Sequence, residues 1–202
     1  MILRSSPASP YGRKCKMSAI VLGVMDKIEV VKADTRDAND SIRKQNPLGK
    51  IPALILDDGT VLFDSPVICE YLDSLAGGGK ILPKTGAARW KALRLEALAD
   101  GILDAALLQV YEKRYRPENI QHKPWVEMQQ DKVQRALDHL EASVPAKVKG
   151  LPDIGQITLA CALGYLDFRF EGKWRAAHPK LVGWLSDYEA AVPAFAKTVP
   201  HD

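Results

Sequence analysis

The segment 46–73 constrains the fold of this chain more than any other stretch. Within it, Asp58-Gly59 separates two short apolar runs, 53–56 and 61–63. Asp-Gly is a strong signal for a two-residue turn, because both positions tolerate positive φ angles. The segment therefore predicts an antiparallel hairpin, and the residues that follow it predict a helix.

The helix is expected to begin at about Pro66. Ser65 offers a side-chain oxygen that accepts hydrogen bonds from a helix N-terminus, and Pro66 lacks the N–H group that a first turn leaves unpaired. Apolar residues recur at helical spacing and predict a face that packs on the hairpin, namely Val67, Ile68, Tyr71, Leu72 and Leu75. The free N–H groups, the Ser65 hydroxyl and the Asp64 carboxylate suit the amino-acid end of a peptide, which carries a carboxylate and an ammonium group.

Lys50-Ile51-Pro52 leads into the hairpin, and a proline in this place is either a trans residue before a strand or part of a cis bond in a tight turn. Only about 5–6% of X–Pro bonds in folded proteins are cis, so the residues alone favour trans. A cis bond would present the Ile51 backbone N–H and C=O to an extended peptide.

Two motifs in this segment carry a family resemblance. Asn-Pro-Leu-Gly-Lys-Ile-Pro-Ala-Leu at 46–54, followed by Asp-Ser-Pro-Val-Ile-Cys-Glu-Tyr-Leu at 64–72, resembles the glutathione-site half of the cytosolic glutathione transferase superfamily. The resemblance covers the whole chain. It implies that glutathione is the co-substrate, that Pro52 is cis, and that Ile51 pairs its backbone with the cysteinyl residue. It also implies that Asp64 and Ser65 bind the γ-glutamyl group.

The order of elements predicts an α/β layer in the first third of the chain. An apolar stretch at 1–5 predicts a strand, Ser9-Pro10 begins a helical pattern that continues to Val24, and 28–31 predicts a second strand. With the hairpin and the helix after it, the order is βαβαββα, with a short helix or loop at 35–44. This order matches a thioredoxin-like domain, which the resemblance also implies.

Three glycines at 77–79 mark the clearest break in the chain. We expect a thioredoxin-like glutathione-binding domain at 1–76, a linker at 77–86 and an all-α helical domain at 87–202. Asp153 and Gln156 fit a capping box that begins the buried central helix of the second domain. Glu70 and Asp73, near the end of the first domain, are expected to face solvent.

Composition excludes several classes of function. The 202 residues carry a net charge of only +3, and no block of lysine and arginine is longer than Arg13-Lys14, which argues against a nucleic-acid surface. No apolar run is long enough for a membrane span and no secretory signal is visible, so a cytoplasmic protein is expected. Cys15, Cys69 and Cys161 are predicted to be buried, reduced thiols, and the four histidines pair with nothing, so no metal site is predicted.

Ser9 is the predicted catalytic residue. Serine-type transferases, which the chain resembles, place their activating hydroxyl in the loop after the first strand, and Ser9 lies in that loop. A hydrogen bond to the glutathione thiolate and the adjacent helix N-terminus would both lower the thiol pKa from roughly 8.5. Alternatively Ser9 only caps the helix, and Tyr11, or Ser5 and Ser6, supplies the hydroxyl. Cys15 lies too deep in the helix to exchange disulfides with glutathione.

The electrophile is expected between the Pro10-Tyr11 loop and the first long helix of the second domain. Candidates on that helix are Asp104, Gln109, Tyr111, Arg114 and Tyr115. Lys50 either pairs with the glycyl carboxylate of glutathione or is a solvated loop lysine. The predicted function is therefore conjugation of glutathione to a small electrophile by a homodimer, the usual state in this family. The alternative is a catalytically weak, transferase-like scaffold that acts through protein contacts.

Overall fold

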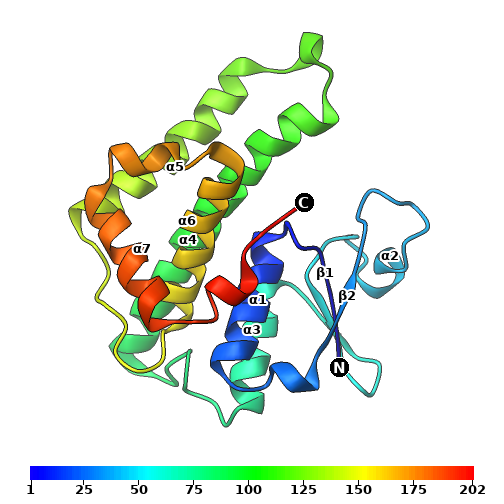
Figure 1. Ribbon diagram of the computed structural model, residues 1–202. Coiled ribbons are helices and arrows are strands. Elements are labelled where there is room, and N and C mark those ends of the chain that lie inside the picture. The colour runs from blue at the N-terminus through cyan, green and yellow to red at the C-terminus, as the bar shows by residue number, and fades with distance from the viewer.

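The computed structural model describes residues 1–202 and shows a small α/β domain beside a larger helical domain (Figure 1). The first domain contains β1 Ile2–Ser5, α1 Pro10–Val21, η1 Met25–Lys27, β2 Glu29–Lys32, α2 Ile42–Gln45, β3 Ala53–Ile55, β4 Val61–Leu62 and α3 Ser65–Leu75. The second contains α4 Gly86–Tyr115, η2 Glu118–Ile120, α5 Lys123–Ala142, α6 Ile154–Phe170, η3 Lys173–Ala176, α7 Pro179–Ala191 and η4 Ala196–Thr198. The predicted element order and fold class are confirmed.

The sheet has the strand order β2-β1-β3-β4. β1 pairs in parallel with β2 and antiparallel with β3, so that Leu3 lies opposite both Val30 and Leu54. β3 and β4 form the predicted hairpin around Asp58-Gly59. α1 and α3 lie side by side between this sheet and the helices α4 and α6 (Figure 1). This is the thioredoxin-like arrangement, and it directs the N-termini of both helices toward the helical domain.

α3 begins at Ser65, one residue earlier than predicted. Asp64 occupies the N-cap position, has extended backbone angles and makes no side-chain capping bond. Its carbonyl oxygen accepts the N–H of Ile68 at 3.1 Å, which starts the helical pattern. The prediction of Ser65 as the capping residue is therefore wrong, because Pro66 fits the second helical position as well as the first. The Ser65 hydroxyl is left free for other partners.

Asp73 is buried and organises the segment after α3. Its carboxylate accepts hydrogen bonds from the backbone N–H groups of Gly79, Lys80 and Ile81 at 2.6, 2.9 and 2.9 Å. The expectation that Asp73 faces solvent is wrong, because these three N–H groups belong to an irregular segment that has no strand or helix to satisfy them. Glu70 is exposed, as predicted.

The two domains share one hydrophobic core. Leu3 and Ile68 of the first domain belong to the same cluster of buried side chains as Ile102 and Leu163 of the second. Helix α6 is its centre and is almost entirely buried from Ile154 to Leu166. All three cysteines are free and buried, as predicted. No helix is sufficiently long and apolar to cross a bilayer.

The predicted capping box at the start of α6 is present. The Asp153 side chain accepts from the Gln156 backbone N–H at 2.9 Å, and the Gln156 side chain accepts from the Asp153 N–H at 3.0 Å. The first turn of the central helix therefore satisfies its own N–H groups inside the protein.

Candidate active site

A cleft of about 610 Å³ lies where the two domains meet. The first domain contributes the start of α1, the loop before β3 and the start of α3, through Ser6, Ala8, Ser9, Pro10, Tyr11, Thr35, Gly49, Lys50, Ile51, Pro52, Asp64 and Ser65. The helical domain contributes Asp104, Leu107, Leu108, Tyr111, Arg114, Tyr165 and Arg169. Two helix N-termini thus face a common cavity, which favours a ligand with negative charge.

Ser9 caps α1 and also faces the cleft. Its side-chain oxygen accepts the Gly12 N–H at 3.1 Å, its backbone is extended, and Pro10 occupies the first helical position. A hydroxyl has two lone pairs and one proton, so accepting from Gly12 leaves the proton to donate. The two alternatives for Ser9, capping and contact with a ligand, are therefore compatible in one geometry.

The loop before β3 presents Lys50, Ile51 and Pro52 to the cleft. The Ile51–Pro52 bond is cis, as the family resemblance implies and contrary to the expectation from the residues alone. Asn46 holds this loop, because its side-chain amide donates to the Lys50 carbonyl at 2.9 Å. The Lys50 ammonium makes no ion pair within the protein.

The start of α3 also lines the cleft, through Asp64 and Ser65. The Asp64 side chain is exposed, whereas Ser65 is only 2% exposed. This part of the lining therefore offers a carboxylate, a hydroxyl and the free N–H groups of a first turn.

Tyr11 connects the two domains across the cleft. Its hydroxyl donates a hydrogen bond to the carboxylate of Asp104 on α4. Burial raises the pKa of Tyr11 above its ordinary value, and the bond to Asp104 raises it further. Tyr11 therefore keeps its proton and donates it to Asp104, which was predicted as a residue of the electrophile pocket.

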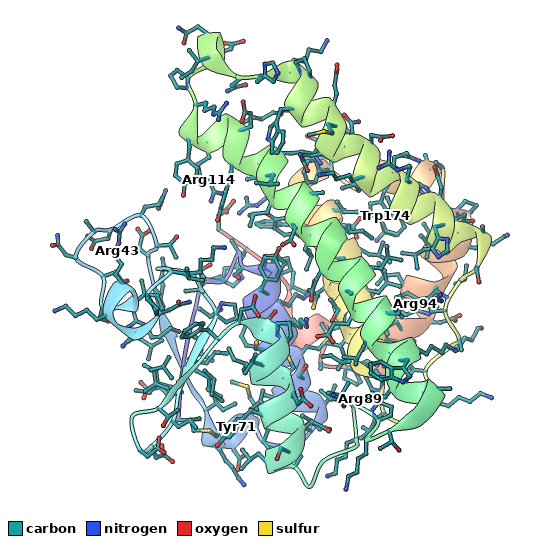
Figure 2. The ribbon with its side chains drawn as sticks, turned by 180° about the vertical axis from the view of Figure 1, so that it is seen from behind. Arg43, Tyr71, Arg89, Arg94, Arg114 and Trp174 are labelled. Atoms are coloured by element: carbon teal, nitrogen blue, oxygen red, sulfur yellow. The ribbon has the colours of Figure 1, made fainter.

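One face of α4 forms the second wall. Asp104, Leu107, Leu108, Tyr111 and Arg114 recur at the spacing of a single helix face and all line the cleft. In Figure 2, Arg114 lies on the side of α4 that faces the first domain. Leu107, Leu108 and Tyr111 form an apolar wall, and Arg114 adds a positive charge to it.

Two candidates on α4 do not line the cleft. Tyr115 is 55% exposed and packs edge-on against Tyr111, with ring centroids 5.1 Å apart. Gln109 is buried, and its amide donates to the Ala105 carbonyl at 3.2 Å. Tyr115 does not line the cleft, contrary to the prediction, because it is the last residue of α4 and lies one turn beyond Tyr111 on the same side of the helix.

Two residues of α6 were not predicted from the sequence. Tyr165 and Arg169 line the cleft, and the Arg169 guanidinium pairs with the Asp202 carboxylate through two contacts of 2.7 and 3.1 Å. Their spacing of four residues at the end of an otherwise apolar helix was the available signal, since it places two polar groups on one face. No cluster of three or more His, Cys, Asp or Glu side chains offers a metal site.

Comparison with known families gives two matches. Residues 8–75 match the family described as "Glutathione S-transferase, N-terminal domain". Residues 123–187 match "Glutathione S-transferase, C-terminal domain". The two matches fall in the α/β domain and the helical domain respectively.

Individual relatives match over almost the full length. The chain is 34% identical over 203 residues to the uncharacterized GST-like protein YibF of Escherichia coli K12, covering 99% of this chain and 98% of that protein. A glutathione transferase family member from Pseudomonas fluorescens Pf-5, solved with bound glutathione, is 41% identical, covering 100% and 99% of the two chains with a TM-score of 0.92. A glutathione S-transferase from Methylobacillus flagellatus KT, solved with glutathione bound, is 35% identical, covering 99% of each chain with a TM-score of 0.89. The fold, the cleft between the domains and these full-length matches place the chain in one family: it belongs to the glutathione S-transferases.

Proposed function

We propose that this protein conjugates glutathione to a small electrophile, with Ser9 stabilising the glutathione thiolate. The observation that carries the proposal is the shared cleft, which is lined by Ser9 at the start of α1, Pro52 before β3 and Ser65 at the start of α3. The glutathione bound to the relative from Pseudomonas fluorescens supports the same choice of co-substrate.

Each end of glutathione has a partner in this arrangement. The γ-glutamyl carboxylate accepts hydrogen bonds from the start of α3 and the Ser65 hydroxyl, and its ammonium group pairs with Asp64. The backbone of the cysteinyl residue pairs with Ile51. The Lys50 ammonium, which has no ion pair of its own, binds the glycyl carboxylate. The sulfur then lies over Ser9.

Thiol activation follows from the Ser9 geometry. A hydroxyl that donates to a charged sulfur contributes about 1.5–3 kcal/mol, and a helix N-terminus adds about 0.3–1 kcal/mol. Together they lower the thiol pKa from roughly 8.5 by about 1–3 units, since each unit corresponds to about 1.4 kcal/mol. The thiolate becomes a major species near neutral pH, and its sulfur forms the new bond to the electrophilic carbon while the leaving group departs with its electron pair.

Tyr11 has a different role in this proposal. Its proton is donated to Asp104, so it is not available to the thiolate. Tyr11 instead forms part of the electrophile pocket together with Pro10, Tyr111 and Arg114.

The proposal includes a homodimer. Large apolar side chains are exposed on neighbouring helices away from the cleft lining, at Val67 and Leu75 of α3 and at Trp90 of α4, which is 68% exposed. Sedimentation equilibrium at micromolar protein is expected to give twice the chain mass, and a monomer would contradict this part of the proposal.

The test of glutathione binding is a calorimetric titration combined with ultraviolet detection of the thiolate in the complex. We expect saturation at millimolar glutathione or below, and a bound thiol with a pKa at least about one unit below that of free glutathione. Absence of heat and of thiolate absorbance at millimolar glutathione would overturn the proposal and favour the scaffold alternative.

A further inference from the structure

The cleft contains a guanidinium that is already bound to a carboxylate. The Arg169 guanidinium, on a side chain that is 16% exposed, pairs with both oxygens of the Asp202 carboxylate, whose side chain is 75% exposed. The guanidinium carbon lies 4.0 Å from the centre of the Phe168 ring, which supports the guanidinium from its other side. The Arg169 guanidinium is thus held in place with two N–H groups directed at a carboxylate, and that carboxylate belongs to an exposed residue, Asp202.

A second guanidinium lies in the same part of the cleft. Arg114 lines the cavity, forms no ion pair, and stands 5.6 Å from the centre of the Tyr111 ring. The hydrogen bond from Arg169 lowers the pKa of Asp202 most, and the charge of Arg114 lowers it further.

In the proposed binding mode, glutathione contacts neither Arg114 nor Arg169. Its glycyl carboxylate is assigned to Lys50 and its γ-glutamyl group to Asp64 and Ser65, all on the first domain. Arg114 and Arg169 belong to the helical domain, on the side of the electrophile. The carboxylate of Asp104, also on that side, is engaged by Tyr11. Arg114 is therefore a cation of the pocket without an ion pair, and the one ion pair of Arg169 is with the exposed Asp202.

We propose that the electrophile carries a carboxylate, which takes the place of Asp202 on Arg169 with Arg114 as the second cation. This inference rests on the proposed conjugation of glutathione and names the substrate class. Arginine presents two parallel N–H groups that match a carboxylate, and the pair is stronger where water is partly excluded. Tyr111, Tyr165, Leu107 and Leu108 provide walls for an unsaturated or aromatic body. Asp202 then competes with the substrate carboxylate for Arg169, and substrate binding displaces it.

A matched pair of electrophiles tests the proposal. In 4-chloro-3-nitrobenzoate and 4-chloro-3-nitrobenzamide, the thiolate sulfur bonds to the ring carbon that carries chlorine, and chloride leaves with its electron pair. Each kcat/KM is divided by the uncatalysed rate constant with glutathione, which removes the difference in intrinsic reactivity. We expect the wild-type protein to prefer the carboxylate by about tenfold or more, the value of one charge-assisted hydrogen bond.

Two variants shift this preference in opposite directions. Arg169→Gln removes the paired N–H donors and is expected to abolish most of the preference, because kcat/KM for the carboxylate falls much more than kcat/KM for the amide. Asp202→Asn removes the competing charge and is expected to raise the preference by about two- to fivefold. Arg135→Gln, which removes an exposed arginine on α5, is the control and is expected to change nothing.

Binding of the two conjugates separates this inference from the proposed function. Calorimetry with the S-(4-carboxy-2-nitrophenyl) and S-(4-carbamoyl-2-nitrophenyl) conjugates of glutathione reports the same preference without turnover. If glutathione binds but wild type does not distinguish the conjugates, or if Arg169→Gln weakens both equally, the carboxylate inference is overturned and conjugation stands. If neither glutathione nor either conjugate binds, both proposals fail.

Discussion

The ammonium nitrogen of Lys14, on α1, lies 2.7 Å from a carboxylate oxygen of Glu96, on α4, and the Lys14 side chain is fully buried. Asp100, one turn further along α4, approaches the same nitrogen to 2.8 Å. This buried cluster links the two domains directly behind the cleft. Lys14 is the shared partner of both carboxylates, so removing Lys14 leaves Glu96 and Asp100 inside the protein without a counter-charge.

Lys14→Met is therefore expected to lower the free energy of unfolding by about 3–5 kcal/mol. Adding Glu96→Gln and Asp100→Asn to the same chain is expected to restore about half of that loss, since no uncompensated charge remains. Urea unfolding of the three proteins measures both effects. Lys123→Met, which removes one partner of an exposed pair, is the control and is expected to leave the stability almost unchanged. If Lys14→Met lowered the free energy of unfolding only slightly, water would have to reach the cluster, and the prediction would be contradicted.

Asp100 is expected to make stability depend on pH. Burial raises the pKa of its carboxyl from 3.8 to about 6, although Lys14 acts in the opposite direction. Because the folded pKa is the higher one, the stabilising contribution is complete below about pH 4 and is lost as the pH rises through about 6. The stability of wild type relative to Asp100→Asn should fall by up to about 3 kcal/mol across this range. Urea unfolding at a series of pH values measures the free energy of unfolding of both proteins. The same pH dependence in wild type and Asp100→Asn would contradict the prediction.

Ser9→Ala is expected to raise the pKa of bound glutathione by about 1–2 units, because the thiolate loses its hydroxyl donor. The conjugation rate below about pH 7 should fall roughly tenfold or more. The loss of the α1 cap should also cost about 1 kcal/mol of stability. Asp153→Ala is the matched control, because it removes a cap of α6 and leaves the thiol unaffected. Full conjugation rates in Ser9→Ala would remove Ser9 from its proposed role.

Tyr11→Phe is expected to leave the pKa of the bound thiol unchanged and to alter KM for the electrophile by a few-fold. The reason is the hydrogen bond from Tyr11 to Asp104, which points the hydroxyl proton away from the thiolate. Ultraviolet titration of the thiolate in wild type and variant is the measurement. A thiol pKa that rises as much as in Ser9→Ala would instead identify Tyr11 as an activating group.

Two glycines in the helical domain are expected to respond in opposite ways to alanine. A Cβ on Gly155 would lie 2.6 Å from the Ala92 carbonyl oxygen and 2.7 Å from the Leu95 Cβ, so Gly155→Ala should cost about 1–3 kcal/mol. A Cβ on Gly101 would meet nothing within 4 Å, so Gly101→Ala should stabilise by about 0.5–1 kcal/mol. Thermal unfolding of both variants tests the close packing of α6 on α4, and equal effects would contradict it.

Features that depend on neighbouring residues were predictable from the sequence. Asp58-Gly59 predicted the hairpin, Ser9-Pro10 predicted the start of α1, and Asp153 with Gln156 predicted the capping box. Each of these signals acts within a few residues through backbone angles and unpaired N–H groups. The exact start of α3 was not predictable, because Asp64 and Ser65 are both capable of the N-cap position.

Features that depend on distant residues were not predictable in the same way. Asp73 is buried because it satisfies N–H groups of an irregular segment whose path is set by the packing of α4 and α6. Tyr115 was expected in the cleft and lies outside it, whereas Tyr165 and Arg169 were unexpected and line it. The packing of the helices decides which turns of a helix reach the cleft and which of its side chains face it.

The sequence by itself determined the thioredoxin-like order of elements, the irregular glycine segment after α3 and the starts of the two helices that border the cleft, because these follow from local backbone preferences and hydrophobic periodicity. The tertiary structure decided how α4 and α6 form the second wall of the cleft, which joins Tyr11 to Asp104 and brings Arg114 and Arg169 into the lining of one cavity. Those contacts join residues far apart in the chain, and only the packing of the two domains brings them together.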